Sequence, residues 1–219
     1  MSENRRDQVA AALARDRLIP IIRSADRRAA VARLEAIAAA GAAVIELTAT
    51  IPSANDLLRE YAESVPALGL GSIRSDTEAR AAIDAGAAFL VTPGVLPTVI
   101  EQARAADAFV IVGGFTPTEI ITAWDLGADA VKWFPASIGG VRALRDLRAP
   151  LPHIPLIPTG GVDRSNAENY LAAGAFAVGV GSALSDEQED VTDATREWLA
   201  LCRATRPPTA VDVRPRRHR

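Results

Sequence analysis

The chain of 219 residues has few of the residues that build covalent or metal-centred sites. Its single cysteine, Cys202, excludes an internal disulfide framework, and its two histidines speak against a histidine-built metal site. No apolar run approaches the roughly 20 residues that cross a membrane. The N-terminal segment lacks the apolar core of a signal peptide, and the net charge of −3 does not favour nucleic acid. These absences predict a cytoplasmic protein that binds no metal, membrane or nucleic acid.

Lysine is almost absent as well. Of the 24 basic residues, Lys132 alone is not an arginine. Arginine cannot form an imine, because its guanidinium stays protonated and its electrons are delocalised. A chain that uses arginine everywhere else and keeps one amine therefore indicates a chemical role for that amine. The alternative is a chance survivor of a drift toward arginine, placed in an outward salt bridge.

Short apolar runs alternate with longer alanine-rich amphipathic segments along the chain. Parallel strands are buried on both faces and read as continuous apolar runs, so this alternation predicts an α/β fold. The predicted strands are LIPII, VIEL, ALGL, FLVT, FVIVG, AVKWF, PLIP and AVGV. The helices predicted between them cover residues 27–40, 54–64, 76–85, 99–105, 118–126, 141–147 and 166–173.

An internal repeat specifies how these units are arranged. The segments AAGAAVIEL, DAGAAFLVT, LGADAVKWF and AAGAFAVGV each run from a helix end through a Gly-Ala turn into a strand. Their glycines (Gly41, Gly86, Gly127 and Gly174) stand where a helix C-cap needs a left-handed residue. The motif recurs at intervals of about 45 residues, long enough for two βα units, so four quarters predict a (β/α)8 TIM barrel. An open doubly wound sheet is the alternative.

The predicted barrel occupies most of the chain. An extra helix is predicted over residues 7–16, ahead of the first strand. Residues 1–204 are predicted to form a single domain. Residues 205–219 are rich in proline and arginine without apolar periodicity, which predicts a solvated, disordered tail.

Strand alternation places Lys132 on the same face of its strand as Ala130 and Phe134, with Val131 and Trp133 on the other. If the first face points inward, the lysine stands inside the barrel beside an aromatic ring. Burial disfavours the charged ammonium, and an amine nucleophile must be uncharged. Catalytic groups of such barrels lie at the C-terminal ends of strands. Lys132 is therefore predicted to be a Schiff-base nucleophile.

Two further strand ends carry polar or glycine-rich groups. Glu46 ends the second strand and is costly to bury unless it is paired or catalytic. It can shuttle protons for Lys132, or form a structural ion pair with Arg23 at the end of the first strand. The seventh and eighth strands end in PTGG and GVGS, whose free backbone N–H groups predict a phosphate site at this corner of the barrel.

These residues make the chain resemble the 2-keto-3-deoxy-6-phosphogluconate (KDPG) aldolases, which also cleave 4-hydroxy-2-oxoglutarate. The resemblance extends from about Leu18 to Leu184 through the blocks IPIIR, VIELTATIPSA, LGLGS, VTPG, GGFTPTE, VKWFPA, PTGGV and VGVGSAL. It implies a class I aldolase that needs no cofactor, holds pyruvate as an imine and forms a homotrimer. Lys132 would be the imine-forming lysine and Glu46 the proton-transferring carboxylate. The resemblance also assigns pyruvate contacts to Phe134, Thr92 and Pro93, and phosphate contacts to Thr159, Gly160, Gly161, Gly181 and Ser182.

The chain departs from the family pattern on the substrate side of the site. Many members have an arginine three or four residues after the glutamate to grip the substrate carboxylate, where this chain has Thr48-Ala49-Thr50. Arg23 is the candidate to replace that arginine, and Thr50 is a further candidate substrate-binding residue. The Gly-Ala-Gly-Thr turn of the family becomes Gly69-Leu70-Gly71-Ser72, which keeps a hydroxyl in Ser72, and Val112 replaces a usual proline.

The predicted activity is cleavage of a phosphorylated 2-keto acid, KDPG, to pyruvate and glyceraldehyde 3-phosphate. Cleavage of 4-hydroxy-2-oxoglutarate to pyruvate and glyoxylate is a second expected activity. The alternatives are a pyruvate aldolase with another acceptor aldehyde, a sugar-phosphate isomerase or epimerase that uses Glu46 as its base, and a non-catalytic barrel that acts as an assembly scaffold.

Overall fold

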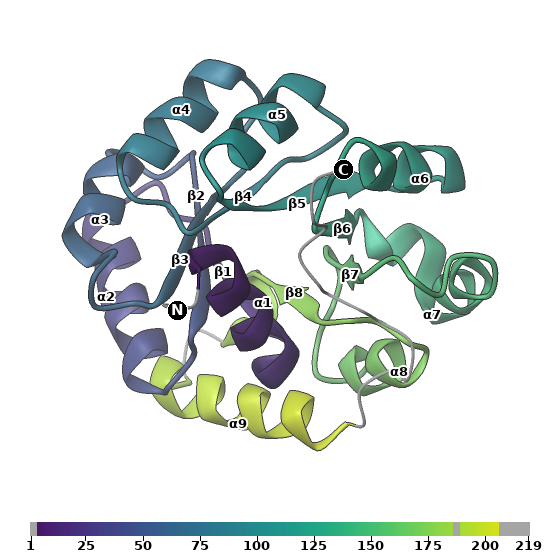
Figure 1. Ribbon diagram of the computed structural model, residues 1–219. Helices are drawn as coiled ribbons and strands as arrows, with labels where there is room; N and C mark the ends of the chain where they lie inside the picture. The colour runs from purple at the N-terminus through teal and green to yellow at the C-terminus, as the bar shows by residue number, and fades with distance from the viewer. Residues whose placement is uncertain (1–3, 186–188, 206–219) are drawn as a thin grey trace.

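The computed structural model describes residues 4–185 and 189–205, and its strands form a barrel ringed by helices (Figure 1). Neighbouring strands pair in parallel in the order β7-β6-β5-β4-β3-β2-β1-β8, and a bridge between Thr159 and Gly179 joins the two ends of this sheet. The strands are β1 (Leu18–Ile22), β2 (Val44–Thr48), β3 (Ala67–Gly71), β4 (Phe89–Val91), β5 (Phe109–Gly114), β6 (Ala130–Trp133), β7 (Leu156–Pro158) and β8 (Val178–Val180).

Helices connect the strands and cover the outside of the barrel (Figure 1). The connecting helices are α2 (Arg27–Ala39), α3 (Ala54–Tyr61), α4 (Asp76–Asp84), α5 (Pro97–Ala105), α6 (Pro117–Asp125), α7 (Ala136–Arg148) and α8 (Ala167–Ala172). After β8 come a short 3-10 turn, η1 (Ser182–Leu184), and a final helix, α9 (Val191–Ala204). Within residues 4–185 and 189–205, no helix has the length and apolar character of a membrane span.

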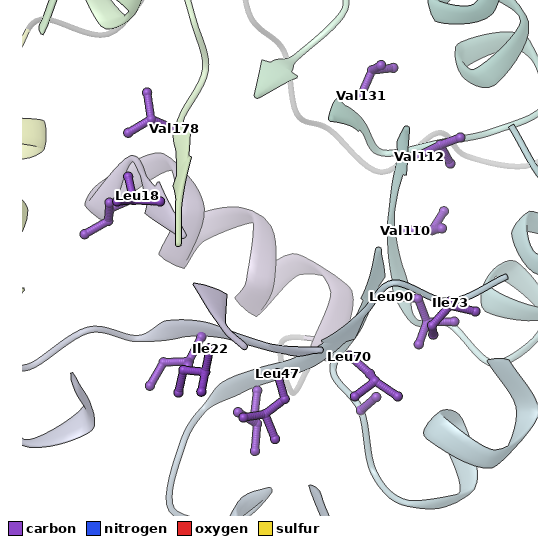
Figure 2. Close-up of a cluster of buried hydrophobic side chains, with 14 of the residues drawn as sticks. Leu18, Ile22, Leu47, Leu70, Ile73, Leu90, Val110, Val112, Val131 and Val178 are labelled. Carbon is purple, nitrogen blue, oxygen red and sulfur yellow. The ribbon is translucent and has the colours of Figure 1, made fainter. Parts of the chain in front are cut away.

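Strand alternation divides the apolar side chains into two layers. The outer layer lies between strands and helices, and Figure 2 shows its members, such as Leu47, Val110 and Val131, pointing away from the barrel interior. The inner layer fills the barrel with Val44, Phe89, Ile111 and other side chains of the opposite strand faces. Each strand therefore has one apolar layer on each of its two faces, which explains why the strand sequences are continuously apolar.

Helix α1 (Arg5–Asp16) seals one end of the barrel. It lies across the barrel opening inside the ring of other helices (Figure 1). Its Val9 and Leu13 are fully buried and belong to the inner apolar cluster rather than to the outer one. The C-terminal ends of the strands lie at the opposite end, which α1 does not cover.

The predicted barrel is confirmed, with each predicted strand end within two residues of the observed one. The four repeat glycines have φ between +90° and +105°, the left-handed values expected of helix C-caps. The extra N-terminal helix is also confirmed, although it begins at Arg5. Residues 206–219, most of the predicted tail, lie outside the described residues.

Two helices differ most from the sequence prediction. Helix α7 begins at Ala136 instead of residue 141, and Gly140 has the non-helical angles φ 68° and ψ 178° inside it. The paired glycines Gly139 and Gly140 hid the first turn, because glycine is a poor helix former. Helix α9 was not predicted, and it packs Trp198, Leu199 and other buried side chains against α2 and α8.

Candidate active site

Lys132 projects into the barrel from β6. Ala130, on the same strand face, belongs to the inner apolar cluster, whereas Val131 and Trp133 belong to the outer one. Trp133 anchors the outer face, because its indole N–H donates to the Phe115 carbonyl at 3.0 Å and its ring stacks on Phe115. The predicted inward direction of Lys132 is therefore confirmed. The residue is 9% exposed, and its Nζ lies 5.5 Å from the centroid of the Phe134 ring.

Glu46 of β2 is the carboxylate nearest to that amine. The distance from Lys132 Nζ to Glu46 Oε1 is 4.0 Å, and Glu46 is 2% exposed. Its carboxylate packs over the neighbouring strand at Gly71, where any Cβ atom would overlap with Glu46 Oε1. Glycine at position 71 therefore leaves the space that the Glu46 carboxylate occupies.

The Glu46 carboxylate is not satisfied by hydrogen bonds within the described residues. Its Oε1 is buried and has no hydrogen-bond partner there. Burial raises the pKa of Glu46, while the positive charges of Lys132 and Arg23 act in the opposite direction. A buried acceptor without a donor is costly. A carboxyl group with a raised pKa accepts a proton more readily than an ordinary glutamate, as a proton-transferring residue must.

A cavity of about 640 Å³ opens above Lys132 at the C-terminal end of the barrel. Its walls come from β1, β6, β7, β8 and the loops that follow them, together with one helix side chain. The lining residues are Ile21, Arg23, Arg33, Lys132, Phe134, Thr159, Gly160, Gly161, Val162, Asp163, Gly179, Gly181, Ser182, Ala183 and Ser185. The predicted lysine, Arg23, Phe134 and all five predicted phosphate residues therefore share one cavity, with Glu46 behind the lysine.

The turn after β7 is shaped by two successive glycines. Gly160 and Gly161 have φ of +84° and +79°, which L-amino acids with side chains rarely adopt. A Cβ atom on Gly161 would lie 2.6 Å from Ser137 Cβ, and one on Gly160 would lie 3.1 Å from the Phe134 ring. Both positions therefore require glycine, and turns of this kind can present backbone N–H groups to an anionic ligand.

Four other predicted substrate residues do not line this cavity. Thr50 is exposed and shares a 2.8 Å hydrogen bond with the Thr48 hydroxyl. Ser72 has a left-handed φ of 64° in the turn after β3. Thr92 is buried and donates to the Gly94 carbonyl at 2.7 Å, and Pro93 packs its backbone against Gly113. All four follow strands β2 to β4, at the same end of the barrel as the cavity.

Sequence reasoning missed three polar residues of the cavity: Arg33, Asp163 and Ser185. Arg33 lies in the second turn of α2, where an arginine has no sequence signal that separates it from its solvent-exposed neighbours. Asp163 and Ser185 follow the two glycine turns by two or three residues. Extending the PTGG and GVGS motifs along the chain would have found Asp163 and Ser185, but no local pattern points to Arg33.

A (β/α)8 barrel with a buried amine beside a carboxylate, at the open end of the strands, has the architecture of a class I aldolase. The sequence model of the KDPG and KHG aldolase family matches residues 9–196. The KHG/KDPG aldolase of Escherichia coli strain K12 is 31% identical over 158 residues, which cover 71% of this chain and 74% of that enzyme.

Solved structures of KDPG aldolases are also similar to this chain. A 4-hydroxy-2-oxoglutarate/2-dehydro-3-deoxyphosphogluconate aldolase from TTHB1 is 36% identical with a TM-score of 0.77, covering 88% of this chain and 97% of that one. The KDPG aldolase of Legionella pneumophila, with pyruvate captured as a covalent carbinolamine, is 26% identical with a TM-score of 0.74 and covers 90% and 98%. This chain belongs to the KDPG and KHG aldolase family, a family of carbon–carbon lyases.

Proposed function

We propose that this protein is a class I aldolase that cleaves KDPG to pyruvate and glyceraldehyde 3-phosphate. It also cleaves 4-hydroxy-2-oxoglutarate to pyruvate and glyoxylate. The observation that carries the proposal is the 4.0 Å approach of Lys132 Nζ to Glu46 Oε1 at the base of a cavity whose other walls are the two glycine turns. The carbinolamine captured in the Legionella enzyme supports the same covalent chemistry.

Lys132 is the nucleophile in this mechanism. Its uncharged amine attacks the C2 carbonyl of the 2-keto acid, and loss of water from the carbinolamine gives a protonated imine. Glu46 transfers the protons that these steps release and consume, and it accepts the proton of the C4 hydroxyl. The C3–C4 bond then breaks, its electron pair moves into the imine to form an enamine, and the aldehyde leaves. Protonation of the enamine at C3 and hydrolysis return pyruvate and the free lysine.

The remaining cavity residues position the substrate. Arg23 pairs with the carboxylate of the keto acid, because its charge already acts on Glu46 and it lines the same cavity as Lys132. The Phe134 ring covers the imine, and the hydroxyls of Thr159 and Ser182 and the backbone N–H groups of the glycine turns hold the phosphate. Thr50, Ser72, Thr92 and Pro93 bound the pyruvate from the loops after β2 to β4.

Reductive trapping tests the proposal. The protein is incubated with pyruvate and sodium borohydride, and its mass is then measured. Because Lys132 is the only lysine, the expected result is a gain of one reduced pyruvate in the wild type and no gain in Lys132→Ala. Absence of a gain in the wild type, or an equal gain in both proteins, would overturn the imine mechanism and favour an isomerase or a scaffold.

We also propose that the protein is a cytoplasmic homotrimer. The family resemblance suggests this state, and several large apolar side chains are exposed in the described part of the chain, among them Ile138 at 73%. Such side chains commonly lie at subunit contacts. Sedimentation velocity should give the mass of three chains, and a concentration-independent monomer would refute the proposal.

A further inference from the structure

We propose that Arg33 is the phosphate-specificity residue of this enzyme, a cation that recognises the distal phosphate of the substrate from helix α2. The inference rests on the proposed function and adds to it a residue outside the motifs that the resemblance assigns. It starts from the fact that Arg33 lines the same cavity as Lys132 and the two glycine turns, although it stands on a helix outside the barrel.

The geometry of α2 directs Arg33 toward the cavity. Arg33 stands three residues after Ala30 and four before Ile37, both fully buried, so it continues the buried face of the helix. Side chains of a helix lean toward its N-terminus. The N-terminus of α2 lies at the open end of the barrel, just after β1, and the long side chain of Arg33 therefore reaches back to the mouth.

A hydrogen bond holds the Arg33 guanidinium at the phosphate end of the cavity, the part formed by the glycine turns after β7 and β8. Arg33 Nη2 donates to the hydroxyl of Ser185 at 3.1 Å, and Ser185 is a buried residue directly after η1. This loop also contains Gly181 and Ser182. Arg33 is thus held beside the turn after β8, whereas the charge of Arg23 acts on Glu46.

The guanidinium of Arg33 has no carboxylate partner in the described residues, so it can pair with an anionic ligand. Among residues 4–185 and 189–205, no carboxylate oxygen lies within 4.0 Å of its guanidinium, in contrast to Arg27 on the same helix, which pairs with Glu60. A guanidinium has five N–H donors in a fork that matches two phosphate oxygens, and the Ser185 bond uses one of them.

The phosphate end also contains a negative charge, which makes a cation necessary there. The carboxylate of Asp163 lines the cavity and accepts hydrogen bonds from the backbone and hydroxyl of Ser165. Those bonds hold the pKa of Asp163 below its usual value, so the group is an anion at neutral pH. Neutral N–H groups of the glycine turns can orient a phosphate, and the cation of Arg33 adds a positive charge that offsets the phosphate dianion.

Steady-state cleavage by Arg33→Gln tests the inference, with KDPG as the phosphorylated substrate and 4-hydroxy-2-oxoglutarate as the substrate without phosphate. We expect kcat/KM for KDPG to fall about 10- to 100-fold, mainly through KM, as for loss of a hydrogen bond to a charged group. The value for 4-hydroxy-2-oxoglutarate should change less than about threefold. Pyruvate trapping at Lys132 should equal that of the wild type, which also shows that the variant is folded.

Two further variants sharpen the result. Arg28→Gln removes an exposed arginine of the same helix and should leave both substrates unaffected. Ser185→Ala removes the hydroxyl that positions Arg33 and should raise KM for KDPG by less than Arg33→Gln does. Inorganic phosphate should inhibit the wild type competitively and inhibit Arg33→Gln at clearly higher concentrations.

The outcomes distinguish failure of the role of Arg33 from failure of the proposed function. If the wild type prefers KDPG and Arg33→Gln keeps that preference, the role of Arg33 is refuted and the proposed function stands. If the wild type cleaves both substrates equally well, the phosphate-binding cavity itself is refuted, and the inference with it. An equal loss on both substrates would make Arg33 a structural residue and would also contradict the inference.

Discussion

Two buried carboxylates, one at each end of the barrel, differ in their hydrogen bonding. Asp16 ends helix α1 at the sealed end and is 1% exposed, and Glu46 stands at the open end and is 2% exposed. Asp16 accepts hydrogen bonds from Arg15, from Arg203 and from the Ala43 N–H. Glu46 has only the amine of Lys132 at 4.0 Å, and its Oε1 lacks a hydrogen bond within the described chain.

The pKa values follow from this difference. Burial by itself would raise the pKa of Asp16, yet the hydrogen bonds from Arg15, the Ala43 N–H and Arg203 outweigh it and lower that pKa. Burial dominates at Glu46 and raises its pKa against the charges of Lys132 and Arg23. The same burial therefore leaves a carboxylate whose anionic form is stabilised at one end and a carboxyl group whose protonated form is favoured at the other.

The arginines at the two ends of the barrel differ in their hydrogen-bond partners in the same way. Arg17 at the sealed end donates to the carbonyls of Ala175, Phe176 and Thr205, and it ties the start of the barrel to its last strand and helix. Arg23 and Arg33 at the open end have no carboxylate partner within 4.0 Å among the described residues. Complete hydrogen bonding at one end stabilises the fold, and incomplete bonding at the other leaves donors for a substrate.

The largest effect is expected from Lys132→Arg, which keeps the positive charge and removes only the ability to form an imine. Cleavage of KDPG should fall more than about 10⁴-fold, as for loss of a covalent nucleophile, and pyruvate trapping should disappear. Coupled assays of pyruvate release measure the rate, and circular dichroism verifies the fold. Retention of even a tenth of the activity would show that Lys132 acts through its charge.

Glu46→Gln should have the next largest effect on activity. An amide cannot exchange protons, so kcat should fall about 10²- to 10⁴-fold. Because the lysine remains, slow trapping of pyruvate by borohydride should still reach completion on long incubation. Unchanged kcat would mean that Glu46 is a structural partner of Lys132, like Asp16 at the other end.

Asp16→Asn should affect stability and leave the chemistry intact. It weakens several charge-assisted hydrogen bonds at once and should lower the free energy of unfolding by about 2–3 kcal/mol, measured by urea denaturation. Activity per folded molecule should equal that of the wild type. Glu60→Gln, which removes an exposed carboxylate paired with Arg27, is the matched control and should change stability little. A larger loss of activity than of stability would contradict the structural role.

The smallest effect, and the sharpest test of the comparison, is the pH dependence of stability. The lowered pKa of Asp16 means that its contribution is present above its unfolded pKa of about 3.9 and is lost as pH falls through its folded pKa. The raised pKa of Glu46 means that its contribution is present below about pH 4.3 and is lost as pH rises through its folded pKa.

Urea unfolding of both variants between about pH 3 and pH 8 measures these slopes. The deficit of Asp16→Asn relative to the wild type should shrink toward acid pH. The stability of Glu46→Gln relative to the wild type should rise toward neutral pH, by about 1.4 kcal/mol for each unit by which the pKa of Glu46 is displaced. Slopes of the same sign would show that the two carboxylates have equivalent environments.

Much of the barrel could be predicted because its signals are local. Continuous apolar runs and the four left-handed glycines define strands and helix ends through neighbouring residues alone. The side on which Lys132 lies followed from alternation along β6 and was confirmed. The roles of the site residues stay predictions, although eight of the thirteen predicted residues line a single cavity.

Other features depend on contacts that no local pattern contains. Gly139 and Gly140 concealed the first turn of α7, and α9 was missed because its apolar stripe becomes evident only against α2 and α8. Arg33 looks like any exposed arginine in the sequence. It becomes a cavity residue only because barrel closure sets β8 beside β1 and places the loop with Ser185 over α2.

The sequence by itself determined the eightfold repeat, the strand face that Lys132 shares with Ala130, and the glycine turns, because each depends on residues close together in the chain or on the repeat. Only the tertiary structure decided that Asp16 is satisfied and Glu46 is not. Hydrogen bonding of a buried carboxylate depends on donors from distant segments. Arg203 donates to Asp16, whereas the amine of Lys132 approaches Glu46 only to 4.0 Å. Closing the barrel brings those donors within reach at one end and leaves the other end open for a substrate.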